Sequence, residues 1–226
     1  MRKILFLFFA LVINKQITYG QEVTIGSQTW MQKNLNVSKY RDGTPIPQVT
    51  DPKKWANLKT GAWCYYENNT ANDTTYGKLY NWYAVAGIYN AASLTNKSLR
   101  KKIAPQGWHV PSDAEWTTLT TFLGGEEVAG GKMKAAGKSL WHSPDNTATN
   151  TSGFTGLPGG ARNFNGFGTF SGIGKGTYWW STTESGSIEV WLRNTVCYRS
   201  VFIFGGQLVS YVLDKTNGFS VRCLRD

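Results

Sequence analysis

Residues 103–116 read IAPQGWHVPSDAEW, and this stretch decides how the middle of the chain folds. Ser112 follows a proline and stands three positions before Glu115, which is the pattern of a capping box at the first turn of a helix. Apolar residues then recur at helical spacing, at Trp116, Leu119, Phe122 and Leu123. The stretch therefore predicts a helix that is capped by Ser112 and stops at the two glycines 124–125.

Signals on either side of this helix predict an α+β domain. Before it, residues 23–31 form two short β-type runs around a Gly-Ser turn, which favours a hairpin. Residues 76–86 place apolar side chains at the spacing of a short buried helix. After it, a weaker helix is expected over residues 126–136, where two central glycines lower helix propensity.

The C-terminal half predicts an irregular region followed by an antiparallel sheet. Residues 153–176 contain nine glycines interleaved with aromatic residues, which indicates an ordered, irregular segment packed on the core. Five strand-like runs follow, at residues 177–181, 188–192, 198–204, 207–213 and 218–224. Gly205-Gly206 is expected to form the turn of a hairpin.

The first twenty residues have the layout of a secretory signal peptide. Basic Arg2 and Lys3 precede an apolar run over residues 4–13, and small residues favour cleavage before Gln21. The run is about half as long as a membrane-spanning helix, so we expect no membrane insertion. No cysteine follows it, so the usual attachment point for a bacterial lipid anchor is missing. We expect residues 21–226 to form one extracytoplasmic domain that is secreted, periplasmic or held at the cell surface.

The charge of the mature chain is only mildly basic. The formal net charge of +10 falls to +7 when Arg2, Lys3 and Lys15 leave with the signal peptide. A secreted chain of this charge, without long runs of basic residues, is not expected to bind nucleic acid. Weak attraction to acidic glycans stays open. The sequence does not indicate an oligomeric state.

Three cysteines, Cys64, Cys197 and Cys223, suit one disulfide and one leftover thiol in an oxidising compartment. We expect Cys64 to pair with Cys223 and Cys197 to stay reduced. Such a bridge would close a long loop and stabilise the fold by ~4 kcal/mol or more in the loop-entropy model.

Three strings identify a family resemblance. The chain resembles the Fibrobacter succinogenes major paralogous domain over nearly all of its mature length. The strings that carry the resemblance are YGKLYNW at 76–82, residues 103–116 and the ending GFSVRC at 218–223, in the order and spacing that this family uses. That domain is similar, more loosely, to the C-type lectin-like fold of formylglycine-generating enzymes and of receptors diversified by retroelements. The resemblance implies a C-type lectin-like single domain with two central helices, a long irregular Gly-rich region and a C-terminal antiparallel sheet. It also implies a ligand surface between Trp179 and Asn217.

The residue patterns that catalysis or metal binding would need are weak. A formylglycine-generating enzyme needs two closely spaced reactive cysteines, whereas Cys197 and Cys223 are 26 positions apart. Two histidines, His109 and His142, are too few for a zinc site without other ligands. The adjacent carboxylates at 126–127 would point in different directions on a helix and would not flank one glycosidic bond. We therefore expect no catalytic site.

A bound calcium ion stays open, although no other cofactor is indicated. Oxygen-rich stretches at residues 67–73 and 145–147 would offer carboxylate and amide ligands. Short clusters of Asn and Asp are, however, also ordinary turn sequences. Calcium is therefore an alternative and not part of the main expectation.

Aromatic residues and arginines mix near the C-terminus, the composition favoured at recognition surfaces. The candidate ligand-binding residues are Trp191, Arg193, Tyr198, Phe202, Phe204 and Tyr211. In an alternating strand, Tyr198, Phe202 and Phe204 share one face, although ordinary sheet packing predicts the same alternation.

The sequence favours a non-catalytic recognition module for an extracellular protein or glycan. An extracellular enzyme acting on polysaccharide or protein, and a structural component of a cell-surface assembly, stay open as alternatives. Diversification of residues 191–217 also stays open.

Overall fold

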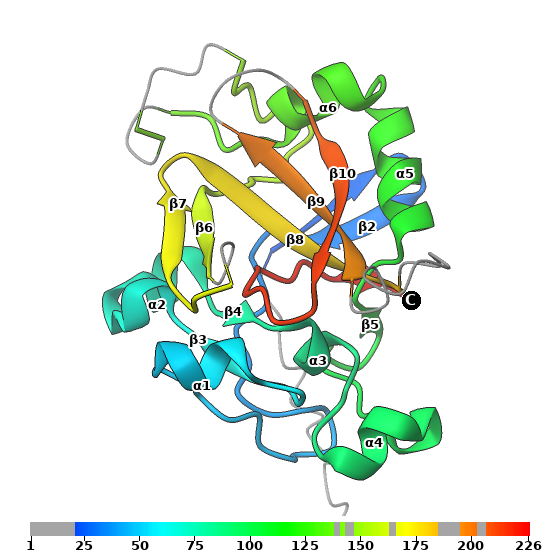
Figure 1. Ribbon diagram of the computed structural model, residues 1–226. Coiled ribbons are helices and arrows are strands. Elements are labelled where there is room, and N and C mark those ends of the chain that lie inside the picture. Colours follow the sequence, from blue (N-terminus) through cyan, green and yellow to red (C-terminus); the bar gives the residue numbers. More distant parts are fainter. Residues whose placement is uncertain (1–20, 138–140, 143–146, 163–165, 185–194, 203–206) are drawn as a thin grey trace, which may run out of the picture.

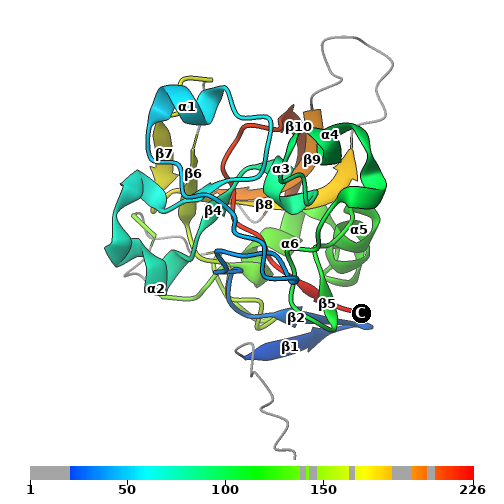
Figure 2. The ribbon, with the colours of Figure 1, turned by 90° about the horizontal axis from the view of Figure 1, so that it is seen from below.

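The computed structural model describes residues 21–137, 141–142, 147–162, 166–184, 195–202 and 207–226, and for some strand residues near the C-terminus it describes only the backbone. Helices pack around several small antiparallel sheets, as Figures 1 and 2 show from two directions. The helices are α1 (Pro52–Ala56), α2 (Asp73–Tyr76), α3 (Trp82–Val85), α4 (Ala91–Thr95), α5 (Asp113–Phe122) and α6 (Glu126–Met133), with 3-10 turns η1 (Tyr66–Asn68), η2 (Thr70–Asn72) and η3 (Lys97–Leu99). The expected α+β class is confirmed.

The first sheet contains both ends of the described chain. Its strands are β1 (Glu22–Ile25), β2 (Gln28–Met31), β11 (Leu224–Arg225) and β5 (Trp108–His109), and they pair antiparallel in that order. The predicted N-terminal hairpin is confirmed, and its turn uses Gly26 at a φ of 61°, which glycine adopts without strain. Leu224 pairs with Trp30 on one side and with His109 on the other. The C-terminal strand therefore joins the hairpin to the segment that precedes α5.

A second sheet crosses the centre of the molecule in Figure 1. Its strands are β8 (Gly176–Glu184), β9 (Thr195–Phe202) and β10 (Val209–Asp214), in the order β10-β9-β8. These strands confirm three of the five predicted C-terminal runs. The run 188–192 and the turn at 205–206 lie outside the described residues.

The Gly-rich region contains regular structure that composition did not predict. There, strands β6 (Gly159–Arg162) and β7 (Phe170–Ile173) form a two-stranded antiparallel sheet. Outside this region, β3 (Trp63–Cys64) and β4 (Leu79–Tyr80) form a second two-stranded antiparallel sheet. The buried guanidinium of Arg162 donates to the carbonyl oxygens of Gly168, Val49 and Thr50. A long-range contact of this kind orders a segment whose glycines alone favour irregular backbone.

The capping box at the start of α5 is confirmed. The Ser112 hydroxyl accepts from the backbone N–H of Glu115, and the Glu115 carboxylate accepts from the backbone N–H of Ser112. The helix ends before the two glycines, as predicted. The second helix, α6, is also present and ends at Met133.

An aromatic cluster joins this helix to both main sheets. Trp116 of α5 lies with its ring centre 4.7 Å from that of Trp30 in β2 and 5.9 Å from that of Trp179 in β8. Phe154, from the Gly-rich region, packs edge-on against Trp179 at 5.3 Å. Burial of such large rings adds apolar stabilisation to the fold.

Two local expectations were wrong in extent. Residues 76–86 form the end of α2, strand β4 and the single turn α3 instead of one helix, because Gly77 leaves the helical conformation at a φ of 73°. Residues 218–224 form isolated bridges from Gly218 to Arg162, Phe219 to Tyr80 and Ser220 to Trp179 before the short strand β11 begins. Their apolar pattern reflects burial among several partners and not one ladder.

The expected disulfide between Cys64 and Cys223 is not formed in the structure, which corrects that prediction. Both are free, buried thiols, and each packs in a different hydrophobic cluster. Cys64 lies with Trp55 and Tyr66, whereas Cys223 lies in the larger core. Burial raises the pKa of each thiol to about 12, so both stay protonated and unreactive at neutral pH.

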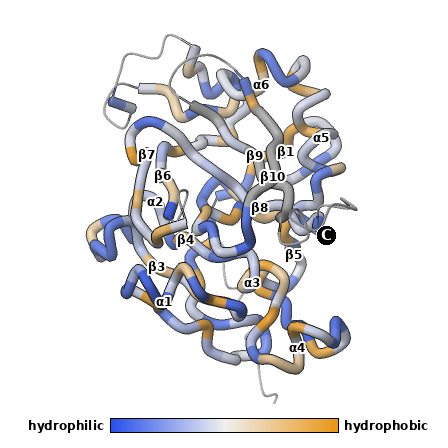
Figure 3. The backbone as a smooth tube through the Cα atoms, in the orientation of Figure 1, coloured by the Kyte–Doolittle hydropathy of each residue, from blue (hydrophilic) through white to orange (hydrophobic). Residues whose placement is uncertain are grey.

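No helix within the described ranges is long and apolar enough to cross a membrane. In Figure 3 the longer helices α5 and α6 mix hydrophobic with hydrophilic residues. The predicted signal peptide, residues 1–20, lies outside the described residues.

Candidate functional site

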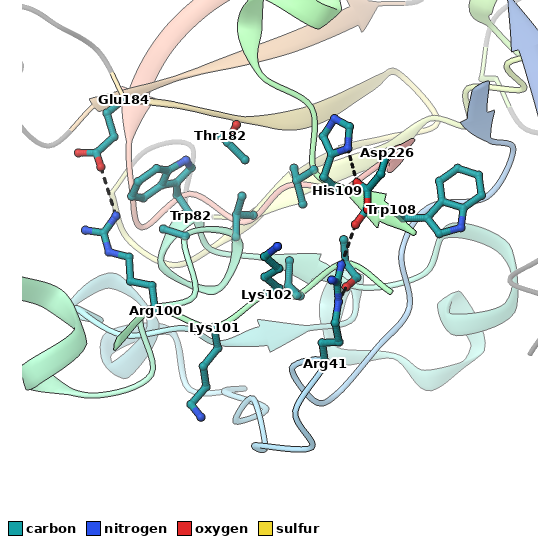
Figure 4. A pocket seen from close by; sticks show the side chains of 15 residues that line it. Arg41, Trp82, Arg100, Lys101, Lys102, Trp108, His109, Thr182, Glu184 and Asp226 are labelled. Atoms are coloured by element: carbon teal, nitrogen blue, oxygen red, sulfur yellow. Dashed lines mark hydrogen bonds and ion pairs between the residues drawn. The ribbon is translucent and has the colours of Figure 1, made fainter. Parts of the chain in front are cut away.

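A cavity of about 350 Å³ opens between α3, the segment 100–104, β5 and the end of β8 (Figure 4). We call it the basic cavity. It is lined by Arg41, Trp82, Val85, Ala86, Arg100, Lys101, Lys102, Ile103, Ala104, Trp108, His109, Val110, Thr182, Glu184 and Asp226. Its volume is typical of a small-molecule site.

A close backbone approach places the basic segment 100–102 beside α3. The N–H of Lys101 donates to the carbonyl oxygen of Gly87 at 3.0 Å. Gly87 has a φ of 73°, and a Cβ atom on it would overlap the backbone of Lys101. Only glycine fits both requirements, so Gly87 determines where the basic segment lies.

Arg41 lines the cavity and fixes the turn at residues 104–108. Its guanidinium donates to the carbonyl oxygens of Ala104 at 2.9 Å, Pro105 at 2.6 Å and Trp108 at 2.8 Å. These bonds order the turn that leads into β5. They neutralise no charge, because every one of these acceptors is a backbone carbonyl.

Lys102 supplies a second uncompensated charge. In Figure 4 it stands between Arg100 and Arg41, whereas Lys101 points away from the cavity centre, to its ion pair with Asp42. The Lys102 side chain is exposed, and among the described residues its ammonium has no hydrogen-bond or ion-pair partner. The lining carries four basic side chains and two carboxylates, so positive charge is in excess.

Glu184 is surrounded by cations at the other end of the cavity. Its carboxylate lies 3.2 Å from Lys215 Nζ, 3.4 Å from Arg100 Nη1 and 4.0 Å from Lys97 Nζ. Partial burial by itself would raise the pKa of Glu184, but Lys215, Arg100 and Lys97 outweigh it and hold the pKa below its usual value. Glu184 is therefore ionised at neutral pH.

His109 lies between two carboxylates at the edge of the cavity. Its Nδ1 is 2.8 Å from Asp226 Oδ1, and its Nε2 is 2.9 Å from Glu115 Oε1. Both ring nitrogens are thus committed, which links the capping box of α5 to the end of β11. An imidazole held in this way positions structure and has no nitrogen left for a ligand.

The floor of the cavity is apolar. Val85, Ile103 and Val110 are buried there, next to the alanines 86 and 104. Trp82 is also buried, and Lys215 Nζ lies 4.8 Å from the centre of its ring. The site therefore combines an apolar base with a cationic rim.

The residues predicted for ligand binding fall largely beyond what the structure describes. Trp191, Arg193 and Phe204 lie outside the described residues. Tyr198 and Phe202 belong to β9 and Tyr211 to β10, and Tyr198 and Tyr211 are cross-strand partners. The structure describes only the backbone of these three residues. The surface on this sheet stays a prediction.

Sequence reasoning missed the residues of the basic cavity. One signal was present, because residues 100–102 read Arg-Lys-Lys and form the longest basic run in the chain. No local pattern, however, indicates that this run meets Arg41 and Glu184. In the described ranges, no group of three or more His, Cys, Asp or Glu side chains is placed to hold a metal ion.

Comparison with known proteins identifies a domain family. The model of the Fibrobacter succinogenes major domain matches residues 23–225. No curated protein and no solved structure matches the chain.

Proposed function

The chain belongs to the Fibrobacter succinogenes major domain family, and from the geometry of the basic cavity we propose that it is a non-catalytic recognition module that binds an anionic ligand there. The observation that carries this proposal is the Lys102 ammonium, which has no partner among the described residues. Arg41 adds a charge that its carbonyl acceptors do not neutralise. A bound anion would compensate this excess of positive charge.

The location and the finer fold belong to the same proposal. The signal-like residues 1–20 support export to an extracytoplasmic compartment. The succession of α5, α6, a Gly-rich region and the sheet β8–β10 supports a C-type lectin-like fold. Thr182 and Glu184 lie at the end of β8, so a protein or glycan larger than the cavity would extend onto this sheet and its predicted aromatic residues.

An enzymatic function is less well supported. Glu184 and Asp226 both line the cavity, which resembles the carboxylate pair of a glycosidase. Such an enzyme needs one carboxyl group with a raised pKa as proton donor. The pKa of Glu184 is lowered, so this carboxylate is a poor proton donor, and Asp226 Oδ1 lies 2.8 Å from His109 Nδ1.

The proposal can be tested by screening acidic and neutral glycans and bacterial surface proteins against the purified chain, with and without a chelator. Binding should be restricted to acidic ligands and should weaken at high ionic strength. Lys102→Gln should weaken it about tenfold or more, the effect of losing roughly 1.4 kcal/mol.

Lys175→Gln is the matched control. It removes the same charge from an exposed lysine beside the opposite end of β8. Equal binding of neutral ligands, or equal losses in both variants, would contradict the proposal. Loss on chelation would add calcium to the site, and loss only in a Phe202→Ala and Tyr211→Ala double variant would move the site to the sheet.

A further inference from the structure

The basic cavity has two chemically different ends, and the inference drawn from them rests on the function proposed above. Its base is formed by Val85, Ile103 and Val110, whose side chains are buried and offer no hydrogen-bonding group. Its rim carries the Lys102 ammonium. A ligand that satisfies both ends needs an apolar group and an anionic group a short distance apart.

The apolar base selects against hydroxyl-rich ligands. A sugar ring placed on Val85 and Ile103 would leave hydroxyl groups without partners, and each unpaired polar group costs about 1–3 kcal/mol on burial. The flat face of Trp82 is not free for sugar stacking, because the residue is buried and Lys215 lies over its ring. The cavity is therefore poorly suited to an acidic saccharide.

The charges of the rim favour a monoanion. Arg41 donates from Nε and Nη2 to backbone carbonyl oxygens, and its Nη1 lies 3.5 Å from Gln106 Oε1. Arg100 donates to Ser93 and is paired with Glu184. Neither guanidinium therefore offers two free parallel N–H groups, the arrangement that binds phosphate through a pair of hydrogen bonds. Glu184 and Asp226 lie on the same lining and would repel a dianion. One free ammonium suits a single carboxylate.

We propose that the ligand of the basic cavity is an apolar carboxylate, which places its apolar group against Val85, Ile103 and Val110 and its carboxylate at Lys102. Two sources share this chemistry, a free short organic acid and the carboxy-terminal apolar residue of a peptide. The volume of about 350 Å³ accommodates one such group. A second hollow of about 510 Å³ shares Arg41, Arg100 and Lys102 with the cavity and continues past Tyr89 and Leu99, which leaves room for a preceding peptide.

The test is calorimetric titration of the full chain with matched ligands. N-acetyl-leucine carries the apolar group and the carboxylate, N-acetyl-leucinamide lacks the carboxylate, acetate lacks the apolar group, and glucuronate is an acidic sugar. We expect saturable binding of N-acetyl-leucine and at least about tenfold weaker binding of the other three, the equivalent of roughly 1.4 kcal/mol. An acetylated tripeptide ending in leucine, compared with its amide, distinguishes the sources, because tighter binding than N-acetyl-leucine assigns a peptide terminus and equal or weaker binding assigns a free acid.

Two variants locate the site. Lys102→Met should weaken N-acetyl-leucine about tenfold, whereas Lys175→Met should leave it unchanged. Ala86→Leu should block the cavity, since Ala86 is partly exposed on its lining and has helical backbone angles that leucine accepts. An unchanged melting temperature shows that each variant is folded.

The outcomes separate this inference from the function on which it rests. If acetate and glucuronate bind as tightly as N-acetyl-leucine and depend on Lys102, the anion-binding function stands and the apolar carboxylate is overturned. If no acid binds, both are overturned. Binding of N-acetyl-leucine that neither Lys102→Met nor Ala86→Leu weakens also overturns the inference.

Discussion

Ser112 and Glu115 satisfy each other's polar groups at the first turn of α5. The Glu115 carboxylate accepts from the Ser112 backbone N–H at 2.7 Å and from its hydroxyl at 2.8 Å. The second oxygen of the same carboxylate contacts His109, at the edge of the basic cavity. One side chain therefore links the start of the helix to the candidate site.

This link should make the chain sensitive to acid. Partial burial by itself would raise the pKa of Glu115, but hydrogen bonds from Ser112 and His109 outweigh it and lower the pKa below the usual value. The lowered pKa adds stability that is present above the pKa of the unfolded chain and is lost as pH falls through the folded value. Urea unfolding between neutral and acid pH should give a falling free energy, with a shallower fall in Glu115→Gln. An identical slope in that variant would contradict the assignment.

Gly87→Ala should destabilise the chain and abolish binding in the basic cavity. The added Cβ would overlap the backbone of Lys101 and would also force alanine into a left-handed conformation. Gly107→Ala is the matched control, because its φ of 78° is similar and nothing lies within 4 Å of the added atom. We expect about 1–2 kcal/mol for the control, from the backbone conformation alone, and clearly more for Gly87→Ala. Equal losses in thermal melts would argue against the close approach.

Arg222 should be intolerant of substitution. Its buried guanidinium donates to the carbonyl oxygens of Met31 and Phe154 and to Asn34, and it lies 4.3 Å from the centre of the Phe154 ring. Burial lowers its pKa to about 9, which still leaves it charged at neutral pH. Arg222→Met would strand several buried acceptors, and we expect a loss of more than about 3 kcal/mol in the free energy of unfolding.

Arg225→Met provides the comparison for that experiment. Arg225 is about half exposed and pairs with Glu22 on the surface. Its loss should change stability by about 1 kcal/mol or less. A similar effect of the two substitutions would show that the buried network around Arg222 contributes little.

Because Cys64 and Cys223 are free thiols, we expect that adding reductant does not change the stability of the chain through these two residues. Both are buried and unpaired with each other, and their raised pKa values make oxidation slow in the folded state. Thiol titration of the unfolded chain without reductant should detect both, with Cys64→Ala and Cys223→Ala variants identifying each signal. If reductant lowered the melting temperature of the parent chain strongly but not that of either variant, the result would show that Cys64 and Cys223 do form a disulfide.

Local sequence patterns determined much of the framework of this protein. The turn at Gly26, the capping box of Ser112 and Glu115, helix α6 and the strands β8 to β10 were readable because each depends on residues a few positions apart. The family, too, was readable from its strings, and the match over residues 23–225 confirms it.

Tertiary structure alone determined which residues form the candidate site and whether Cys64 and Cys223 are bonded. The basic cavity brings Arg41, Lys102 and Glu184 together from three distant segments, and which charges stay uncompensated depends on acceptors that no local pattern reveals. Residues 218–220 looked like one strand but bridge three separate segments, because apolar periodicity reports burial and not the partner. The thiols of Cys64 and Cys223 are free because each packs in a different hydrophobic cluster, and that separation in space has no trace in their sequence spacing.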